Sequence, residues 1–152
     1  MSTETPIRGC TSSKVRQLMR RIAQHYDAEV SKAGLKTTQY SLLVNVAELG
    51  PIRPVDLAHR LKMTPSTLSR NLQPLIAAGW LEIGKGPDAR SHLLSVSESG
   101  RAKRIEAKQR WKVAQRSLNA LLGEERVLAL HELIDESLDL FGGIDEADVH
   151  EP

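Results

Sequence analysis

The chain has 152 residues, of which 40% are hydrophobic and 26% charged, a composition typical of one globular domain with extensions. No apolar run approaches the roughly 20 residues of a membrane span, the first residues form no apolar signal segment, and the single cysteine excludes a disulfide framework or a multi-cysteine metal site. The net charge of +2 conceals a basic middle, with nine Lys and Arg against four acids over residues 53–104, and an acidic end, with ten acids against one base over residues 123–152. We therefore expect a cytoplasmic protein with no membrane partner, metal or cofactor. The basic middle fits a surface for a polyanion or, equally well, a solvated face.

The first predicted helix carries an apolar side chain at every third or fourth position over residues 15–30. Ser12 or Ser13 is its expected N-cap, and Gly34 is its expected end. With the leader, this segment forms an expected N-terminal dimerisation region over residues 1–36.

Three shorter helices follow. The second is expected to start at Thr37 or Thr38 and to end at Gly50-Pro51, and the third begins at Pro54, a residue suited to a first helical turn. The fourth has Thr64 as its N-cap and Pro65 as its first residue. Pro74 removes a backbone hydrogen bond inside this helix and predicts a kink there.

The period then changes from helical to strand-like. Residues 80–83 and 92–96 are short strand-like runs, and residues 84–91 between them are rich in turn formers and bases. This pattern predicts a β-hairpin with a basic tip. A long helix from Ser97, weakened by a glycine in its first turn, and a last helix after Gly123 complete the chain.

The expected fold is mostly α with a small β-hairpin wing. A winged helix-turn-helix head occupies residues 37–98, helical dimerisation segments occupy residues 99–142, and an acidic tail occupies residues 143–152. This prediction rests on the order of the elements: a helix, a short helix, a tight connection, a capped helix and a hairpin with a basic tip.

The fourth helix has the surface of a DNA-reading helix. Leu68, Leu72 and Leu75 face inward by their spacing, and we expect short polar or cationic side chains on the other side, namely Ser66, Thr67, Ser69, Arg70 and Asn71. Arginine suits guanine, asparagine suits adenine, and the free amides at a helix N-terminus suit a phosphate. A solvated face of a core helix would look the same, but the adjoining basic hairpin favours DNA.

Six segments resemble the MarR (multiple antibiotic resistance regulator) family, over residues 18–101. In chain order they are GLKTTQY (34–40), VDLAHRL (55–61), TLSRNL (67–72), AGWL (78–81), DARS (88–91) and LSVSESGR (94–101). Each segment alone is a moderate match, and their order and spacing together carry the resemblance.

The resemblance implies a homodimer whose first and last helices intertwine and place two winged heads on a palindromic operator in double-stranded DNA. It also implies that Asp88 pairs with Arg90 and that this arginine enters the minor groove. The residues then expected to contact DNA are Pro65, Ser66, Thr67, Ser69, Arg70, Asn71, Lys85, Asp88, Arg90 and Ser91. Family members usually have Ser or Thr where Arg53 stands, so the third helix lacks this cap here, and either its start is less rigid or Arg53 reaches a phosphate.

An effector is implied as well, because many members release DNA when a small aromatic or phenolic acid binds between the dimer base and the head. The candidate ligand-binding residues are Arg16, Arg20, His25 and Tyr40, since arginine matches a carboxylate bidentately. A solvated basic stripe is the alternative interpretation of these bases.

Other members of the family sense oxidants through a cysteine near the first helix. Cys10 is the candidate here, with Arg8 and Lys14 near enough to lower its pKa. An unreactive surface thiol is the alternative.

The function expected first is ligand-responsive repression of transcription. An architectural nucleic-acid binder without an effector, a redox-sensing regulator and a winged helix that docks proteins are the alternatives, and the basic wing argues against the last. An enzyme has little support. The sequence contains no phosphate loop, nucleophile elbow or zinc-protease motif, its five histidines are scattered, and no catalytic residue is expected.

Overall fold

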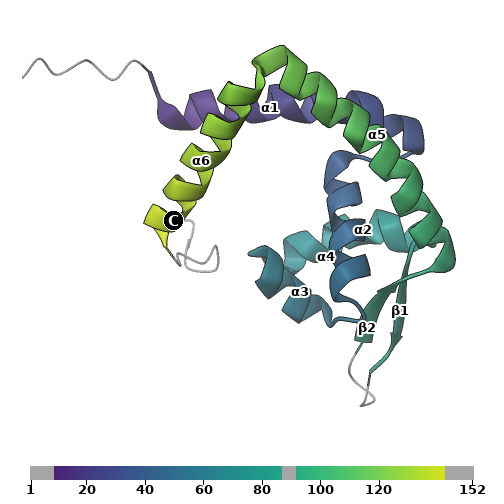
Figure 1. Cartoon of the computed structure of the whole chain (residues 1–152). Coiled ribbons are helices and arrows are strands. Elements are labelled where there is room, and N and C mark those ends of the chain that lie inside the picture. The colour runs from purple at the N-terminus through teal and green to yellow at the C-terminus, as the bar shows by residue number, and fades with distance from the viewer. Residues whose placement is uncertain (1–8, 87–91, 143–152) are drawn as a thin grey trace, which may run out of the picture.

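The structure is a computed structural model that describes residues 9–86 and 92–142 (Figure 1). Its helices and strands are, in order, α1 (Thr11–Val30), the 3-10 turn η1 (Ser31–Ala33), α2 (Thr37–Leu49), α3 (Pro54–Leu61), α4 (Pro65–Ala77), β1 (Leu81–Lys85), β2 (His92–Val96), α5 (Glu98–Leu122) and α6 (Glu124–Phe141). A mostly helical fold with one two-stranded hairpin confirms the predicted class. No helix among the described residues is long and apolar enough to cross a membrane.

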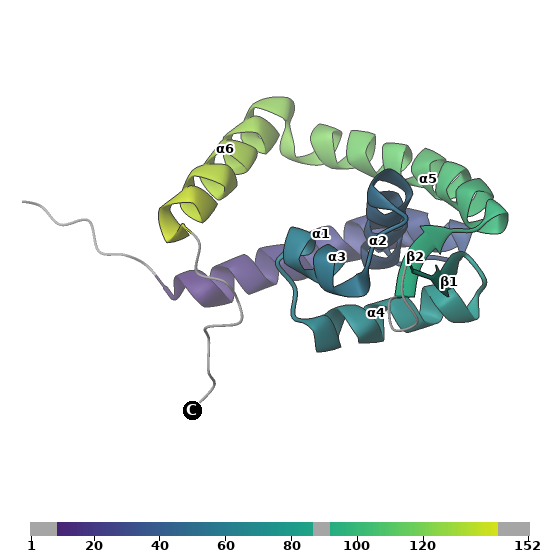
Figure 2. The same ribbon diagram turned by 90° about the horizontal axis from the view of Figure 1, so that it is seen from below.

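The molecule separates into a head and two arms (Figures 1 and 2). The head consists of α2, α3, α4 and the hairpin of β1 and β2, which pack on one another. α1 packs along α5, and α6 leaves the far end of α5 and stands apart from the head. We call the first half of α1 (residues 11–21) and the whole of α6 the two arms.

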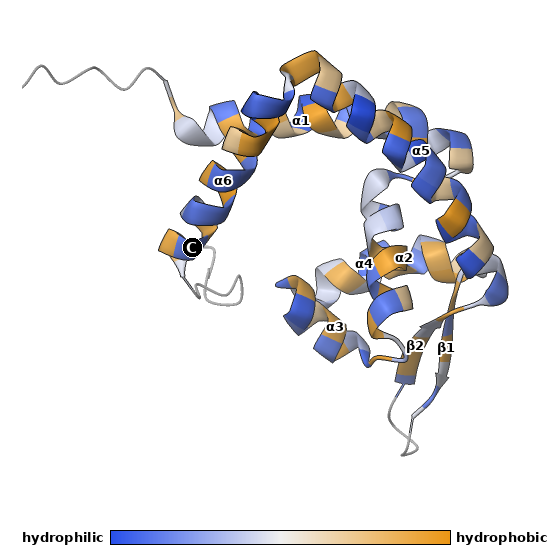
Figure 3. Cartoon of the chain, viewed as in Figure 1, coloured by the Kyte–Doolittle hydropathy of each residue, from blue (hydrophilic) through white to orange (hydrophobic). Residues whose placement is uncertain are grey.

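The core lies in the head and is built from leucines. Leu43, Leu57, Leu68, Leu75 and Leu94 are at most 1% exposed and come from four different elements. In Figure 3, hydrophobic residues of α2 and α4 lie in the region where these two helices meet. Burial of this kind stabilises by about 1.5–3 kcal/mol per large side chain, so the head closes on its own core.

The helix ends follow the predicted caps in the head but not in α1. The Oγ1 atom of Thr64 accepts the backbone N–H of Thr67 at 3.3 Å, which confirms the cap of α4. The Ser12 or Ser13 prediction for α1 is wrong, because the helix begins at Thr11, where the carbonyl of Cys10 already accepts the first helical bond. α1 also ends at Val30, and η1 continues from it to Gly34.

Two residues that are expected from the sequence to disturb a helix, Pro74 and Gly100, lie within continuous helices in the structure. α4 continues past Pro74 to Ala77, and the Pro74 carbonyl accepts the N–H of Ala78 at 3.0 Å. Gly100 lies where α5 passes the start of the hairpin, and a Cβ atom there would overlap the carbonyl oxygen of Trp80. Glycine at this position therefore permits a close packing contact rather than weakening the helix.

The hairpin is anchored to the head by a third backbone segment. β1 and β2 pair antiparallel, with Leu81 opposite Val96 and Ile83 opposite Leu94. Ile52 exchanges two backbone hydrogen bonds with Leu94, at 2.8 and 3.0 Å. The base of the wing is thus fixed beside α3 and α4.

Direct contacts tie α1 and α5 to the head. The Oδ1 atom of Asp27 accepts both the backbone N–H and the hydroxyl of Thr37, at 2.8 and 2.7 Å, and so caps the start of α2. The Nζ atom of Lys103 donates to the Ala33 carbonyl at 2.9 Å. Movement of α1 against α5 would therefore act on the first turn of α2.

Candidate nucleic-acid interface and effector cavity

α3 and α4 are joined by a tight connection that fixes the start of α4. Lys62 adopts a left-handed conformation with φ 52°, which lets its N–H reach the His59 carbonyl and the N–H of Met63 reach the Ala58 carbonyl. These two bonds form a Schellman end for α3. Three residues after α3 ends, Thr64 caps α4, and its hydroxyl accepts the N–H of Thr67, so the start of α4 is fixed relative to α3.

α4 presents a polar side to solvent, largely as predicted. Its inward side is Leu68, Leu72 and Leu75, which are all buried. The predicted contact residues found exposed are Pro65, Ser66, Ser69, Arg70 and Asn71. Thr67 departs from the expected exposed side: it is half-buried, and its Oγ1 atom accepts a hydrogen bond from Thr64 at 2.8 Å, because it closes the N-cap.

The sequence interpretation overlooked Gln73. At 100° per residue, Gln73 lies on the same side of α4 as Ser66 and Arg70, opposite the buried leucines, and it is exposed. Its amide is a donor and an acceptor in a geometry that fits an adenine edge. Gln73 follows Arg70 by three residues and Ser66 by seven, and this helical spacing is the signal that identifies it.

Part of the predicted wing is described. Lys85 ends β1, opposite His92, and its side chain is exposed at the point where the chain enters the tip of the hairpin. Asp88, Arg90 and Ser91 lie outside the described residues.

Arg53 occupies the N-cap of α3 without a side-chain cap, as the sequence implied. Its Nε atom instead donates to the Asp56 carboxylate at 2.8 Å, in the first turn of the helix. Both side chains are exposed, so the pair contributes at most a few tenths of a kcal/mol.

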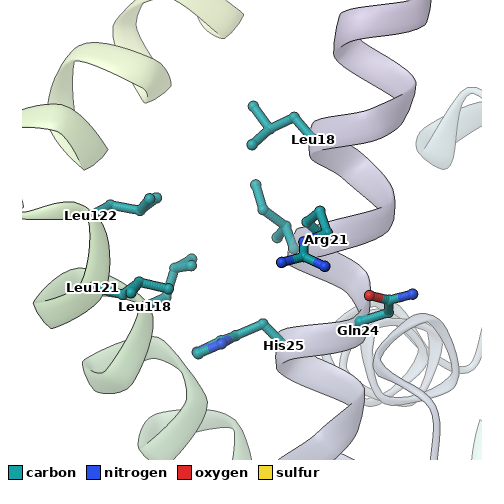
Figure 4. Close-up of a pocket in the computed structure, with 8 residues that line it drawn as sticks. Leu18, Arg21, Gln24, His25, Leu118, Leu121 and Leu122 are labelled. Atoms are coloured by element: carbon teal, nitrogen blue, oxygen red, sulfur yellow. The ribbon is translucent and has the colours of Figure 1, made fainter.

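A cavity of about 360 Å³ lies between α1 and the end of α5 (Figure 4). His25 is the only predicted ligand-binding residue that lines it, and Arg21, which was not predicted, supplies its guanidinium. The remaining lining residues are mostly apolar: Leu18, Ile22, Gln24, Leu118, Leu121 and Leu122. His25 is held in place because its Nε2 atom lies 3.2 Å from the Ala114 carbonyl.

The other three candidate ligand residues lie elsewhere. Arg16 and Arg20 are exposed on the first half of α1, and Tyr40 is buried in the first turn of α2. Burial raises the pKa of Tyr40, an effect that Arg104 opposes and Glu48 reinforces. The structure thus does not bring the four residues into one cavity.

Cys10 is exposed at the N-cap of α1. Hydrogen bonds from the backbone and the hydroxyl of Ser13, and then from the backbone of Ser12, lower the pKa of its thiol. The cause therefore lies in the first turn of the helix rather than in Lys14, and Arg8 is outside the described residues. Elsewhere in residues 9–86 and 92–142, His, Cys, Asp and Glu form no group that could hold a metal ion.

The helix-turn-helix of α3 and α4 has a second helix that is capped and exposes a polar side, and the hairpin is held beside it. This arrangement defines a winged helix-turn-helix protein. The sequence model of the MarR family matches residues 33–91, from the end of η1 to the tip of the hairpin. One relative, the uncharacterized HTH-type transcriptional regulator YwoH of Bacillus subtilis (strain 168), is 24% identical over 90 residues. The match covers 59% of this chain and 66%, just under two thirds, of YwoH.

Solved structures agree with this match. A probable transcriptional regulator from Pseudomonas aeruginosa is 25% identical with a TM-score of 0.76, over 86% of this chain and 98% of that one. The transcriptional repressor CouR, solved on a 23-mer DNA duplex, is 21% identical with a TM-score of 0.77, over 85% and 92% of the two chains. Over residues 33–91, and in its overall fold, the chain is similar to the MarR family of transcription regulators. The family contains regulators rather than enzymes, which confirms the expectation that the protein is not an enzyme.

Proposed function

We propose that this regulator is a cytoplasmic homodimer that represses transcription by binding palindromic operators in duplex DNA, and that a small aromatic or phenolic acid releases it. The observation that carries the proposal is α4, whose apolar side is fixed in the core while Ser66, Arg70 and Gln73 face solvent. CouR, which has a similar fold, was solved on a DNA duplex, and this supports the same binding mode here.

Each exposed group on α4 suits a different part of a DNA groove. In the first turn of α4, Pro65 has no N–H and Thr67 donates its N–H to Thr64, so the N–H of Ser66 is the group suited to a phosphate at this helix N-terminus, which carries a partial positive charge. Arg70 suits the O6 and N7 atoms of guanine, and Asn71 and Gln73 suit adenine. The hydroxyl of Ser69 reaches a phosphate or a base edge.

The wing supplies the second contact in this proposal. Lys85 stands at the end of β1 next to the tip, and the family resemblance implies that Arg90, held by Asp88, enters the minor groove, with Ser91 as a further DNA contact. An arginine in a narrow minor groove responds to groove width and phosphate charge rather than to base identity. α4 would therefore select the sequence, and the wing would add affinity.

The arms supply the dimer in this proposal. Val15, Leu18 and Met19 on α1 and six large apolar side chains on α6 are exposed in the single chain. Apolar surface of this extent marks a protein interface, and a two-fold dimer would place two α4 helices on the two halves of a palindrome.

The cavity between α1 and α5 is the proposed effector site. Leucines on both helices form its apolar walls, and Arg21 and His25 supply the polar groups. This combination suits an aromatic ring with one carboxylate. A ligand there would press on the α1–α5 contact, which is tied to α2 through Asp27 and to η1 through Lys103.

Selection of binding sites from a random duplex pool tests the DNA-binding proposal. The pool should converge on an inverted repeat whose half-sites lie about one helical turn apart, because each head reads one half-site. The Gln73→Ala variant should select the same repeat with a weaker preference at one adenine of each half-site, whereas the control Arg116→Ala, at an exposed arginine of α5, should select it unchanged. A pool that stays random would show that the protein does not read sequence.

A screen of small aromatic acids tests the effector proposal. Acids that raise the melting temperature should also release the selected operator, and Arg21→Ala should reduce both effects more than Arg116→Ala does. If no acid that binds releases DNA, the protein is a constitutive binder without an effector.

The thiol of Cys10 supports one alternative, a regulator that responds to oxidants, because its lowered pKa increases the reactive thiolate. Under this alternative, peroxide releases the operator from the native protein but not from Cys10→Ser. Equal release from both proteins would exclude it.

A further inference from the structure

The head contains a second cavity, beside the polar side of α4. This head pocket has a volume of about 170 Å³ and lies where the first turn of α3, one flank of α4 and the two strands of the hairpin meet. Figure 2 shows α3 and the hairpin on the same side of α4, which both of them contact. The lining is mostly apolar, with Pro54, Val55, Leu72, Ile76, Ile83 and Leu94. Leu72 and Leu94 are buried, whereas Val55 is 58% and Ile83 50% exposed, so the rim of the pocket is apolar as well.

The head pocket adjoins the proposed DNA contacts. Ser69 and Gln73 line it, and both also belong to the exposed polar side of α4. Ser69 and Gln73 are one turn apart, and Ile76 follows three residues later, so these three side chains form one flank of the helix, between the buried leucines and Arg70. The edge of a base pair that meets Gln73 therefore also meets the opening of the pocket.

The lining favours a neutral, apolar occupant. None of the described residues that line the pocket is charged. A phosphate or a carboxylate would lose water there without gaining an ionic partner. In the major groove of DNA, the apolar group that a base presents is the 5-methyl group of thymine. This methyl group lies on the same edge of an A·T pair as the adenine N6 and N7 atoms, which an amide such as that of Gln73 recognises.

We propose that the head pocket is a specificity site for the operator. The methyl group of one thymine in each half-site packs against Val55 and Ile83, while Gln73 binds the adenine of the same base pair. This inference rests on the DNA reading by α4 in the proposed function, and it adds which base pair α4, α3 and the hairpin read together. The pocket disfavours cytosine, which has no methyl group at this position. The base of the hairpin thus takes part in the choice of sequence, unlike its tip.

Removal of the methyl group alone tests the proposal. In the repeat selected from the random pool, each thymine is replaced in turn by deoxyuridine, which keeps every hydrogen-bonding group of the base. The largest loss of affinity should occur at the thymine paired with the adenine at which Gln73→Ala weakens the preference. The native chain should bind there roughly fourfold more weakly for each half-site replaced, because the burial of about one methyl group is lost.

A variant of the rim shows whether the pocket causes this loss. Val55→Thr with Ile83→Thr makes the rim polar and keeps its branched shape, and because both side chains are half exposed, the melting temperature should stay close to that of the native chain. This variant should bind the thymine and deoxyuridine operators equally well. The matched control is Val113→Thr with Ile105→Thr, at two exposed positions of α5 that do not line the pocket. It should show the same fourfold difference as the native chain.

The possible failures can be told apart. If the native chain tolerates deoxyuridine at this thymine, or if the rim variant keeps the difference, the pocket does not receive a thymine methyl group, although the protein still reads DNA. An aromatic acid that raises the melting temperature of the native chain but not of the rim variant, with deoxyuridine tolerated throughout, would also overturn the proposal. If the pool stays random, the proposed function itself fails, and this inference fails with it.

Discussion

The head and the arms contain similar amphipathic helices with opposite outcomes in a single chain. In the head, the leucines of α2, α3 and α4 meet one another and are almost fully buried. In the arms, Met19 is 62% and Leu140 89% exposed. An apolar residue at every third or fourth position therefore predicts that one side of a helix is buried, but it does not predict whether the same chain or another one buries it. The head buries its own apolar side chains, whereas those of the arms remain exposed in a single chain.

In the proposed dimer, this difference would assign DNA recognition to the head and dimerisation to the arms. The closed core of the head fixes α4 and the paired strands, and the arms would set the distance between the two heads. Asp27 and Lys103 connect the two functions, since they tie α1 and α5 to η1 and the first turn of α2.

The largest expected effect comes from the core of the head. Leu68→Ala should destabilise the chain by about 2–5 kcal/mol, because a fully buried leucine leaves a cavity. Leu138→Ala on α6 should change unfolding little at the concentration where the protein is monomeric. Denaturant unfolding of both variants measures the contrast, and equal losses at low concentration would show that α6 is covered within one chain.

The next effect separates the two proposed DNA contacts. Arg70→Ala should cost about 1–3 kcal/mol on the selected operator and less on a scrambled duplex, because it removes a base contact. Arg90→Ala should weaken both duplexes alike and reduce the salt dependence by about one ion per monomer. Asp88→Ala should act as a milder Arg90→Ala. Native-like binding of Arg90→Ala to both duplexes would remove the wing from the interface.

A smaller effect is expected at the junction between α1 and the head. Asp27→Ala removes the acceptor of two hydrogen bonds from Thr37 and should cost about 0.5–2 kcal/mol, the usual range for a lost helix cap. Thr38→Ala, one residue along, is the matched control. If unfolding shows no difference between the two variants, the cap does not hold α2.

The smallest effect concerns the start of α3. Arg53→Ser would exchange a weak surface ion pair for a side-chain cap and should stabilise by about 0.5–1 kcal/mol. A loss of melting temperature in this variant would show that the pair with Asp56 matters more than the cap.

Features set by neighbouring residues could be predicted from the sequence. Thr64 and Pro65 mark the start of α4, and the change of period at Trp80 marks the hairpin, because caps and periodicity act within a few residues. Contacts between distant segments could not be predicted. Gly100 was expected to weaken α5, yet it makes room for the Trp80 carbonyl, and Arg21 rather than Arg16 or Arg20 lines the cavity. Which flank of α1 meets α5 depends on packing that the spacing alone does not determine.

Light scattering of the full chain at micromolar concentration tests the contrast between head and arms most directly. The exposed stripes of α1 and α6 predict a mass of twice the 16.8 kDa of one chain, and dilution should give a concentration-dependent loss of helix as the arms separate. A particle of 16.8 kDa that keeps its full helical content would contradict the account, because the arms would then be stable without a partner.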